Sequence, residues 1–115
     1  MSPDCLFCKI RDGVIPGKIV LRDEHLFAFE DIRPQAPTHV LICPTRHIGT
    51  TNDLADGDAE LIGRLVLAAR RIAADRGLAD DGYRLVFNCN RGAGQAVYHI
   101  HLHLLGGRAF TWPPG

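Results

Sequence analysis

The sequence lacks the features that mark exported, membrane-spanning and disordered proteins. None of its apolar runs approaches the roughly 18 residues that a transmembrane helix needs, and no basic segment followed by an apolar one precedes Lys9. Hydrophobic residues make up 46% of the 115 residues and charged residues 23%, the balance of an ordinary globular protein. We therefore expect a cytoplasmic protein that has no membrane partner.

The chain also lacks net charge. Thirteen Lys and Arg residues balance thirteen Asp and Glu residues, so the formal charge is zero at pH 7. Without an excess of positive charge, no long-range field attracts nucleic acid or an anionic membrane surface. Nucleic acid is therefore not an expected partner, and local contacts must hold any anionic ligand.

Internal repeats, low-complexity tracts and linker-like stretches of Pro, Gly or Ser are missing as well. Residues 1–115 are therefore expected to form a single domain. A domain of this size buries roughly 65% of the surface of its unfolded chain, so it does not need covalent cross-links to fold.

The hydrophobic pattern predicts an α+β fold with an antiparallel sheet, one long helix and a short N-terminal helix. The short helix is expected to begin at an N-cap, Asp4, and to end at Gly13, and the long helix to run from Asp56 or Asp58 to Arg76. The apolar residues at helical spacing in the long helix are Leu61, Ile62, Leu65, Val66, Ala69, Ile72 and Ala73. Strands are expected at residues 19–22, 26–29, 40–43, 83–89 and 97–105.

Histidine is the unusual part of the composition, because three of the six histidines fall within five residues. In the segment HIHLHLL, His99, His101 and His103 alternate with apolar residues, so a strand would place all three rings on one face, about 6.6 Å apart. Alternation alone is typical of any half-buried strand. Three aligned imidazoles, a side chain whose reference pKa is near 6.5, however, indicate metal binding, nucleophilic chemistry or proton transfer.

The cysteines divide into a close pair and two isolated residues. Cys5 and Cys8 have the CxxC spacing of a metal-binding or redox pair, although a closed tetrahedral site needs two further ligands. A redox pair is less favoured, because neither a WCxxC segment nor a βαβ pattern surrounds it. Cys43 and Cys89 lie in apolar runs and are interpreted as small core residues.

The segments HIHLHLL, APTHVLICPTRHI, GYRLVFN, GQAVYHIHLHLLGGR and WPPG together resemble the histidine triad (HIT) superfamily, in particular its Hint branch of histidine triad nucleotide-binding proteins. The resemblance implies the HIT fold and a symmetric homodimer with a sheet continuous across both subunits. It also implies that the tail around Trp112 reaches the partner subunit near its active site.

The same resemblance implies a purine nucleoside phosphoramidase, which cleaves the P–N bond of purine nucleoside 5'-monophosphoramidates and releases AMP or GMP. His101 matches the nucleophile that forms a nucleotidyl-histidine intermediate, and a neutral imidazole is a competent nucleophile at pH 7. His103 matches a residue that binds and neutralises the phosphoryl oxygens. A dinucleoside polyphosphate hydrolase, or a nucleotide-binding module with little turnover, remains an alternative.

Further residues match the nucleotide-binding positions of the family. Asp31 matches the carboxylate that binds the ribose hydroxyls. His39 matches a histidine beside the triad, and we expect it to orient the triad. The residues expected at the phosphate are Asn88, Gly94, Gln95 and Ala96, and those expected in the apolar walls of the purine pocket are Leu6, Phe7, Ile10, Phe29 and Ile32. For the apolar residues, ordinary core packing is an equally good interpretation.

Two features set this chain apart from many Hint sequences. Ala96 stands where they have a serine, so no hydroxyl is available there, and water or His103 would have to protonate the leaving group. The second feature is the CxxC pair. HIT proteins that carry it bind zinc through residues matching Cys5, Cys8, His47 and His99, which implies a structural zinc ion that the chemistry does not require.

Overall fold

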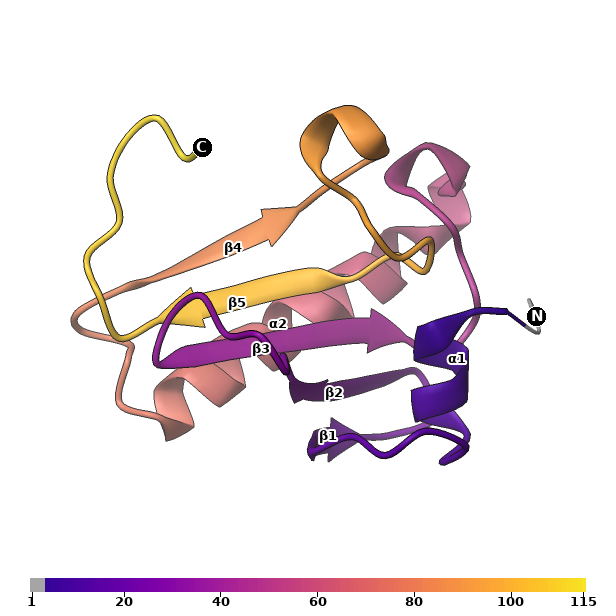
Figure 1. Cartoon of the computed structure of the whole chain (residues 1–115), viewed down its shortest axis with the longest axis horizontal. Helices are drawn as coiled ribbons and strands as arrows, with labels where there is room; N and C mark the ends of the chain where they lie inside the picture. The colour runs from indigo at the N-terminus through magenta and orange to yellow at the C-terminus, as the bar shows by residue number, and fades with distance from the viewer. Residues whose placement is uncertain (1–3) are drawn as a thin grey trace.

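The computed structural model describes residues 4–115 as a five-stranded antiparallel sheet with a helix on each face (Figure 1). The strand order is β1-β2-β3-β5-β4, and every neighbouring pair is antiparallel. The elements are α1 (Leu6–Arg11), β1 (Ile19–Arg22), β2 (Leu26–Glu30), β3 (Thr38–Pro44), α2 (Ala59–Asp75), β4 (Tyr83–Phe87) and β5 (Leu102–Gly106). The predicted α+β fold is confirmed.

The two sheet faces carry separate apolar cores, because side chains alternate along each strand. Leu26 and Ala28 of β2 pack with α2, together with Leu102 and Leu104 of β5. The intervening residues of β2, Phe27 and Phe29, pack on the other face with α1. Figure 1 shows α2 behind the sheet and α1 in front of it, near one end of the strands. The central strands are therefore covered by α2 on one face and, at one end, by α1 on the other.

Helix α2 matches the prediction except at its margins. Three-residue turns at Thr51–Asp53 and Asp56–Asp58 precede it, and Gly77, with φ of 71°, follows its end. Leu65, Ala69, Ile72 and Ala73 are buried as predicted. Val66 is 38% exposed, because the buried stripe turns toward Ala68 instead. The buried face of α2 is therefore rotated slightly from the one that the sequence suggests.

The largest correction concerns the last strand, which was predicted at residues 97–105 but begins only at Leu102. Pro44 has no N–H to donate to a longer ladder, and its carbonyl accepts a hydrogen bond from the His99 ring. Residues 96–101 therefore run as irregular chain, tied to the preceding loop by the Ile100 N–H and the Ile48 carbonyl. Likewise, β4 ends at Phe87 rather than at residue 89.

Helix α1 begins one residue later than predicted. Its N-cap is Cys5 and not Asp4, because the Cys5 sulfur accepts the hydrogen bond from the Cys8 N–H at 3.3 Å. The helix ends at Arg11, and Gly13 follows with φ of 76°. Within residues 4–115, none of the helices has the length and hydropathy of a membrane span.

Candidate functional site

His101 lies just before β5 with its ring buried against the edge of Phe7. The two ring centroids are 4.9 Å apart and nearly perpendicular. The Nδ1 atom donates a hydrogen bond to the His99 carbonyl at 2.7 Å, so the single proton of the neutral ring lies on Nδ1. Burial lowers the pKa of His101, so this ring is neutral at pH 7. Nε2 therefore keeps a free lone pair, the requirement for a nucleophile.

His103 follows on β5, and its ring lies beside that of His101 with centroids 4.9 Å apart. His39 Nδ1 accepts a hydrogen bond from the Gln35 N–H at 3.1 Å, so a neutral His39 carries its proton on Nε2. That Nε2 lies 2.9 Å from His103 Nδ1 and 3.5 Å from an Asp31 oxygen. His103 Nδ1 is then an acceptor, and its proton is held on Nε2.

A cavity of about 440 Å³ runs from these rings along α1, a size typical of small-molecule sites. Eleven of the thirteen residues expected to act in catalysis or nucleotide binding line it, namely Leu6, Phe7, Ile10, Phe29, Asp31, Ile32, Asn88, Gly94, Ala96, His101 and His103. Its apolar walls lie between α1 and the sheet, and its polar groups lie at the histidine end.

Gln95 and His39 do not line this cavity. Gln95 is 5% exposed, and its side chain accepts from the Asn90 N–H at 2.7 Å and donates to the carbonyls of Gly49 and Val97. The Gln95 side chain therefore holds the loop that forms the polar end of the cavity. His39 is buried and acts on the cavity through two of its lining residues, His103 at 2.9 Å and Asp31 at 3.5 Å.

Ordinary core packing is excluded for two of the apolar residues. Leu6 is 42% exposed and Ile32 is 90% exposed, so both lie at the rim of the cavity rather than in the core. Phe7, Ile10 and Phe29 are buried and line the cavity as well, so for them both interpretations hold.

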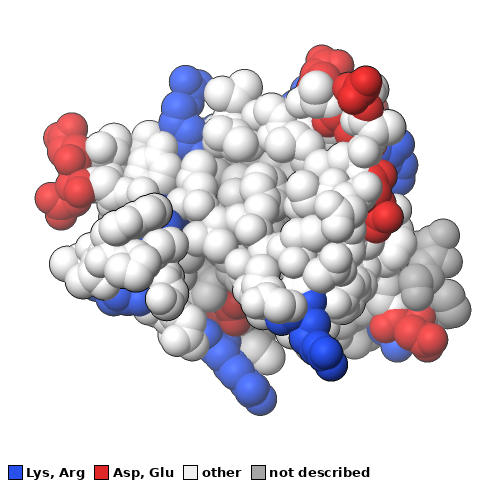
Figure 2. Space-filling view, turned by 90° about the horizontal axis from the view of Figure 1, so that it is seen from above, with Lys and Arg blue, Asp and Glu red and all other residues white. Residues whose placement is uncertain are grey.

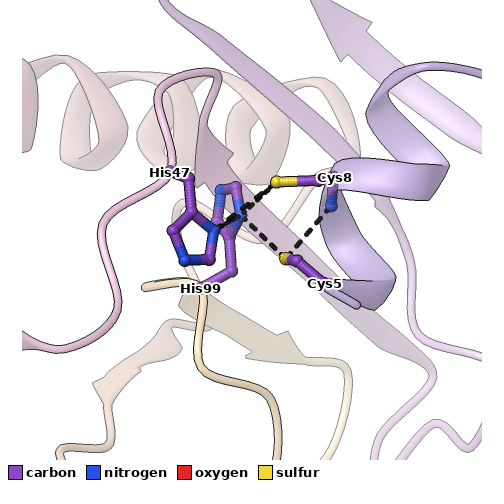
Figure 3. A group of neighbouring side chains, drawn as sticks. All are labelled: Cys5, Cys8, His47 and His99. Atoms are coloured by element: carbon purple, nitrogen blue, oxygen red, sulfur yellow. Dashed lines mark hydrogen bonds between the residues drawn. The ribbon is translucent and has the colours of Figure 1, made fainter. Parts of the chain in front are cut away.

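Four potential metal ligands converge beside the N-terminal end of α1 (Figure 3). They are Cys5, Cys8, His47 and His99, here called the Cys/His cluster. His99 Nδ1 lies 3.3 Å from Cys5 Sγ, 3.5 Å from Cys8 Sγ and 3.3 Å from His47 Nδ1. With the usual zinc–sulfur and zinc–nitrogen bond lengths, tetrahedral ligand atoms lie about 3.3–3.8 Å apart. The cluster therefore fits a tetrahedral metal ion.

The protonation of the cluster also suits a metal. His99 donates through Nε2 to the Pro44 carbonyl at 2.8 Å, which leaves Nδ1 unprotonated toward the two sulfurs. Burial lowers the pKa of His99 to about 4 and, with the Cys5 hydrogen bond, raises the pKa of Cys8 to about 11. The imidazole is thus ready to ligate, whereas the Cys8 thiol must lose its proton when an ion binds.

Asp31, His39 and His103 also bring potential ligand atoms together. Both nitrogens of His39 are engaged, Nδ1 with the Gln35 N–H and Nε2 with His103. We therefore interpret this second group as a chain of hydrogen bonds and not as a metal site.

Residues 12–110 match the HIT domain family. This chain belongs to the HIT family. A curated relative from Escherichia coli (strain K12), named purine nucleoside phosphoramidase, is 50% identical over 108 residues, which cover 94% of this chain and 91% of the relative.

Solved structures of other HIT proteins have the same fold. A HIT family hydrolase from Legionella pneumophila superposes with a TM-score of 0.95 at 59% identity, covering 97% of this chain and 100% of the other. A histidine triad protein from Clostridium difficile superposes with a TM-score of 0.93 at 34% identity, and 96% of each chain is covered. The expectation of a HIT fold is therefore confirmed.

Within this HIT fold, sequence reasoning missed five cavity residues: Ile15, Pro16, Arg33, Leu41 and Val97. Leu41 pairs with Phe29 across β2 and β3, so the alternation along β3 was a usable signal for it. Nothing in the local pattern distinguishes the other four, because the folding of the loops brings them to the cavity.

Proposed function

We propose that this protein hydrolyses the P–N bond of purine nucleoside 5'-monophosphoramidates and releases AMP or GMP and an amine. The observation that carries the proposal is the hydrogen bond from His101 Nδ1 to the His99 carbonyl, which leaves Nε2 free at the polar end of the cavity. The name of the Escherichia coli relative supports the same activity.

In the first step, His101 Nε2 attacks the α-phosphorus and the P–N bond to the amine breaks. The departing amine needs a proton, and the Nε2–H of His103 is the donor that the hydrogen-bond chain from His39 supplies. The negative charge that this transfer leaves on His103 is balanced by the positive charge of the nucleotidyl-imidazolium formed at His101. In the second step, water attacks the phosphorus, the bond to His101 breaks, and the proton lost by water returns to His103. Each histidine ends the cycle as it began.

Contacts at the phosphate and at the nucleoside are divided between the two ends of the cavity. Asn88 and the Ala96 backbone N–H supply donors for the phosphoryl oxygens, because the N–H groups of Gly94 and Gln95 already donate to the carbonyls of Arg91 and Asn90. Asp31 binds the ribose hydroxyls: one oxygen accepts from the Arg33 N–H at 2.8 Å, which fixes the carboxylate at the cavity rim. The apolar walls hold the purine.

The absence of a hydroxyl at Ala96 favours a second candidate, a nucleotide-binding module with little turnover. A third candidate is the hydrolysis of dinucleoside polyphosphates, and a comparison of two substrates distinguishes it from phosphoramidate hydrolysis. We expect AMP release from an adenosine 5'-alkylphosphoramidate and none from a diadenosine polyphosphate.

The deciding experiment is rapid quench of a phosphoramidate reaction followed by intact-mass analysis. The expected result is a nucleotidyl adduct on His101, which His101→Ala abolishes together with about 10³-fold or more of the rate. His25→Ala is the matched control, because that ring lies outside the cavity. An adduct on another residue, or full activity of His101→Ala, would contradict the mechanism.

We further propose that the metal of the Cys/His cluster is zinc, because two sulfur and two imidazole ligands in tetrahedral array are typical of structural zinc sites. Such an ion cross-links α1 to the segments that carry His47 and His99.

We also propose a homodimer joined through β4. This strand is at the sheet edge, and Leu85 on it is 36% exposed, because α2 packs under β3 and β5 instead. Figure 2 looks onto this edge, and its charged side chains lie mostly around the margin. Trp112, which is 84% exposed, is then available to reach the partner subunit.

A further inference from the structure

The Cys/His cluster and the nucleotide cavity share a wall, which is helix α1. This helix has only six residues, too few to be stable without tertiary contacts. Cys5 caps it and Cys8 lies in its first turn, so half of the cluster belongs to α1. Leu6, Phe7 and Ile10 on the same helix line the cavity. An interaction that holds Cys5 and Cys8 in position therefore also holds this wall of the cavity in position.

Two contacts connect the cluster directly to His101. The first runs through His99, whose ring belongs to the cluster and whose carbonyl accepts the hydrogen bond from His101 Nδ1 at 2.7 Å. The second runs through Phe7, which lies between the two cysteines in sequence and sets its ring against that of His101 at 4.9 Å. Phe7 also packs edge-on against Phe29 at 5.2 Å, which ties it to the sheet.

We propose that a metal ion at the Cys/His cluster acts as a positioning element for the nucleophile, so that metal occupancy controls the nucleotide site. The bound ion holds α1 and His99, and through Phe7 and the His99 carbonyl it holds the His101 ring in line with the phosphate. Loss of the ion releases α1, which widens the apolar wall and lets the ring turn. This inference rests on the proposed function only for its rate measurement.

The first test compares chelator-treated protein with the same protein reloaded with zinc alone. The AMP dissociation constant is measured by calorimetry, and the rate of nucleotidyl adduct formation is measured in a single turnover. Metal removal is expected to weaken AMP binding about 10-fold and to slow adduct formation about 10- to 100-fold, and reloading restores both. Equal affinity and equal rate in folded metal-free and loaded protein would overturn the proposal.

Ligand variants provide the matched comparison. Cys5→Ser removes a ligand and is expected to behave as metal-free protein, whereas Cys5→His keeps a zinc ligand and recovers affinity and rate on loading. Cys89→Ser is the control, because Cys89 lies outside the cluster. If Cys5→Ser matches Cys89→Ser in AMP affinity and adduct rate, the coupling does not exist.

Phe7→Leu covers the case in which the metal-free protein does not fold. This variant leaves all four ligands in place, so zinc content stays at one ion per chain while adduct formation slows about 10-fold. An unchanged rate would overturn the part of the proposal that runs through Phe7 and leave only the connection through the His99 carbonyl. The outcomes also distinguish this inference from the proposed function. If AMP affinity responds to zinc but no adduct forms, only the proposed function is refuted. If AMP affinity does not depend on zinc and turnover is normal, only this inference is refuted.

Discussion

The Nε2 atom of His39 lies 2.9 Å from the Nδ1 atom of His103, and this contact determines which nitrogen of His103 carries its proton. Since the Gln35 N–H occupies the other nitrogen of His39, the proton of His39 points to His103. The only proton of a neutral His103 is then on the nitrogen that is free to donate to a leaving group.

Replacing His39 tests this arrangement through the leaving group. His39→Ala is expected to lower kcat about 100-fold for an alkylamine leaving group and far less for a nitrophenolate, which departs without a proton. His39→Gln is expected to recover part of the loss, because its amide both accepts from Gln35 and donates to His103. Steady-state kinetics with both substrates measures the effect. Equal losses for the two leaving groups would indicate a merely structural role.

The protonation of His103 predicts how stability depends on pH. Burial lowers the pKa of this ring to about 4, whereas the unfolded chain binds the proton near pH 6.5. The unfolded state therefore binds more protons between these values, and stability present above pH 6.5 is lost as the pH falls toward 4. Because the ring is partly exposed, the free energy of unfolding that His103 contributes and that is lost between pH 7.5 and pH 5 is at most about 2 kcal/mol.

Urea unfolding of the wild type and of His103→Asn at the two pH values measures this share. The variant is expected to lose less free energy of unfolding than the wild type on acidification. His25→Asn serves as the control, because its ring is exposed. A His103→Asn variant with the pH dependence of the wild type would show that His103 is not the residue responsible.

Adding the missing hydroxyl provides a third prediction. Ala96 lines the polar end of the cavity, so Ala96→Ser is expected to raise the rate about 10-fold by donating to the phosphoryl group or the leaving group. Ala93→Ser is a suitable control, since Ala93 is exposed and lies outside the cavity. Single-turnover kinetics distinguishes the two variants. A slower Ala96→Ser enzyme would mean that the alanine provides needed space.

Leu85 on the free edge strand tests the proposed dimer. Leu85→Glu places a charge in the expected interface and should weaken association by about 100-fold or more. Val14→Glu is the control, because Val14 is 71% exposed and lies outside the sheet. Sedimentation velocity over a range of concentrations gives the dissociation constants. Identical association of both variants would place the interface elsewhere.

Much of the fold follows from local patterns. The long helix, the hairpin of β1 and β2, and the placement of His103 opposite Leu102 and Leu104 each reflect a periodicity that the sequence displays. The start of β5 could not be predicted from this periodicity. Residues 97–101 alternate as a strand would, but the Ile100 N–H donates to a loop carbonyl and not to a neighbouring strand. Alternation of apolar and polar residues indicates that one face of a segment is buried, but it does not show which segment its backbone is hydrogen-bonded to.

The candidate site was predictable in its residue types and not in its hydrogen bonds. The histidines and cysteines are recognisable by spacing, but the His99 carbonyl that accepts from His101 is a backbone group, which no residue type reveals. The capping role of Cys5 was hidden in the same way, because cysteine is not among the preferred N-cap residues. The single domain and the cytoplasmic location stay predictions.

The alternation of the central strands has a practical consequence for anyone who redesigns this molecule. Phe29, Leu41 and His103 face α1, while their immediate neighbours Ala28, Ile42 and Leu104 support α2 on the reverse side. Ligand preference can therefore be altered by a combinatorial library restricted to every second position. The core between the sheet and α2 keeps its packing, so such a library disturbs only the second core, around α1.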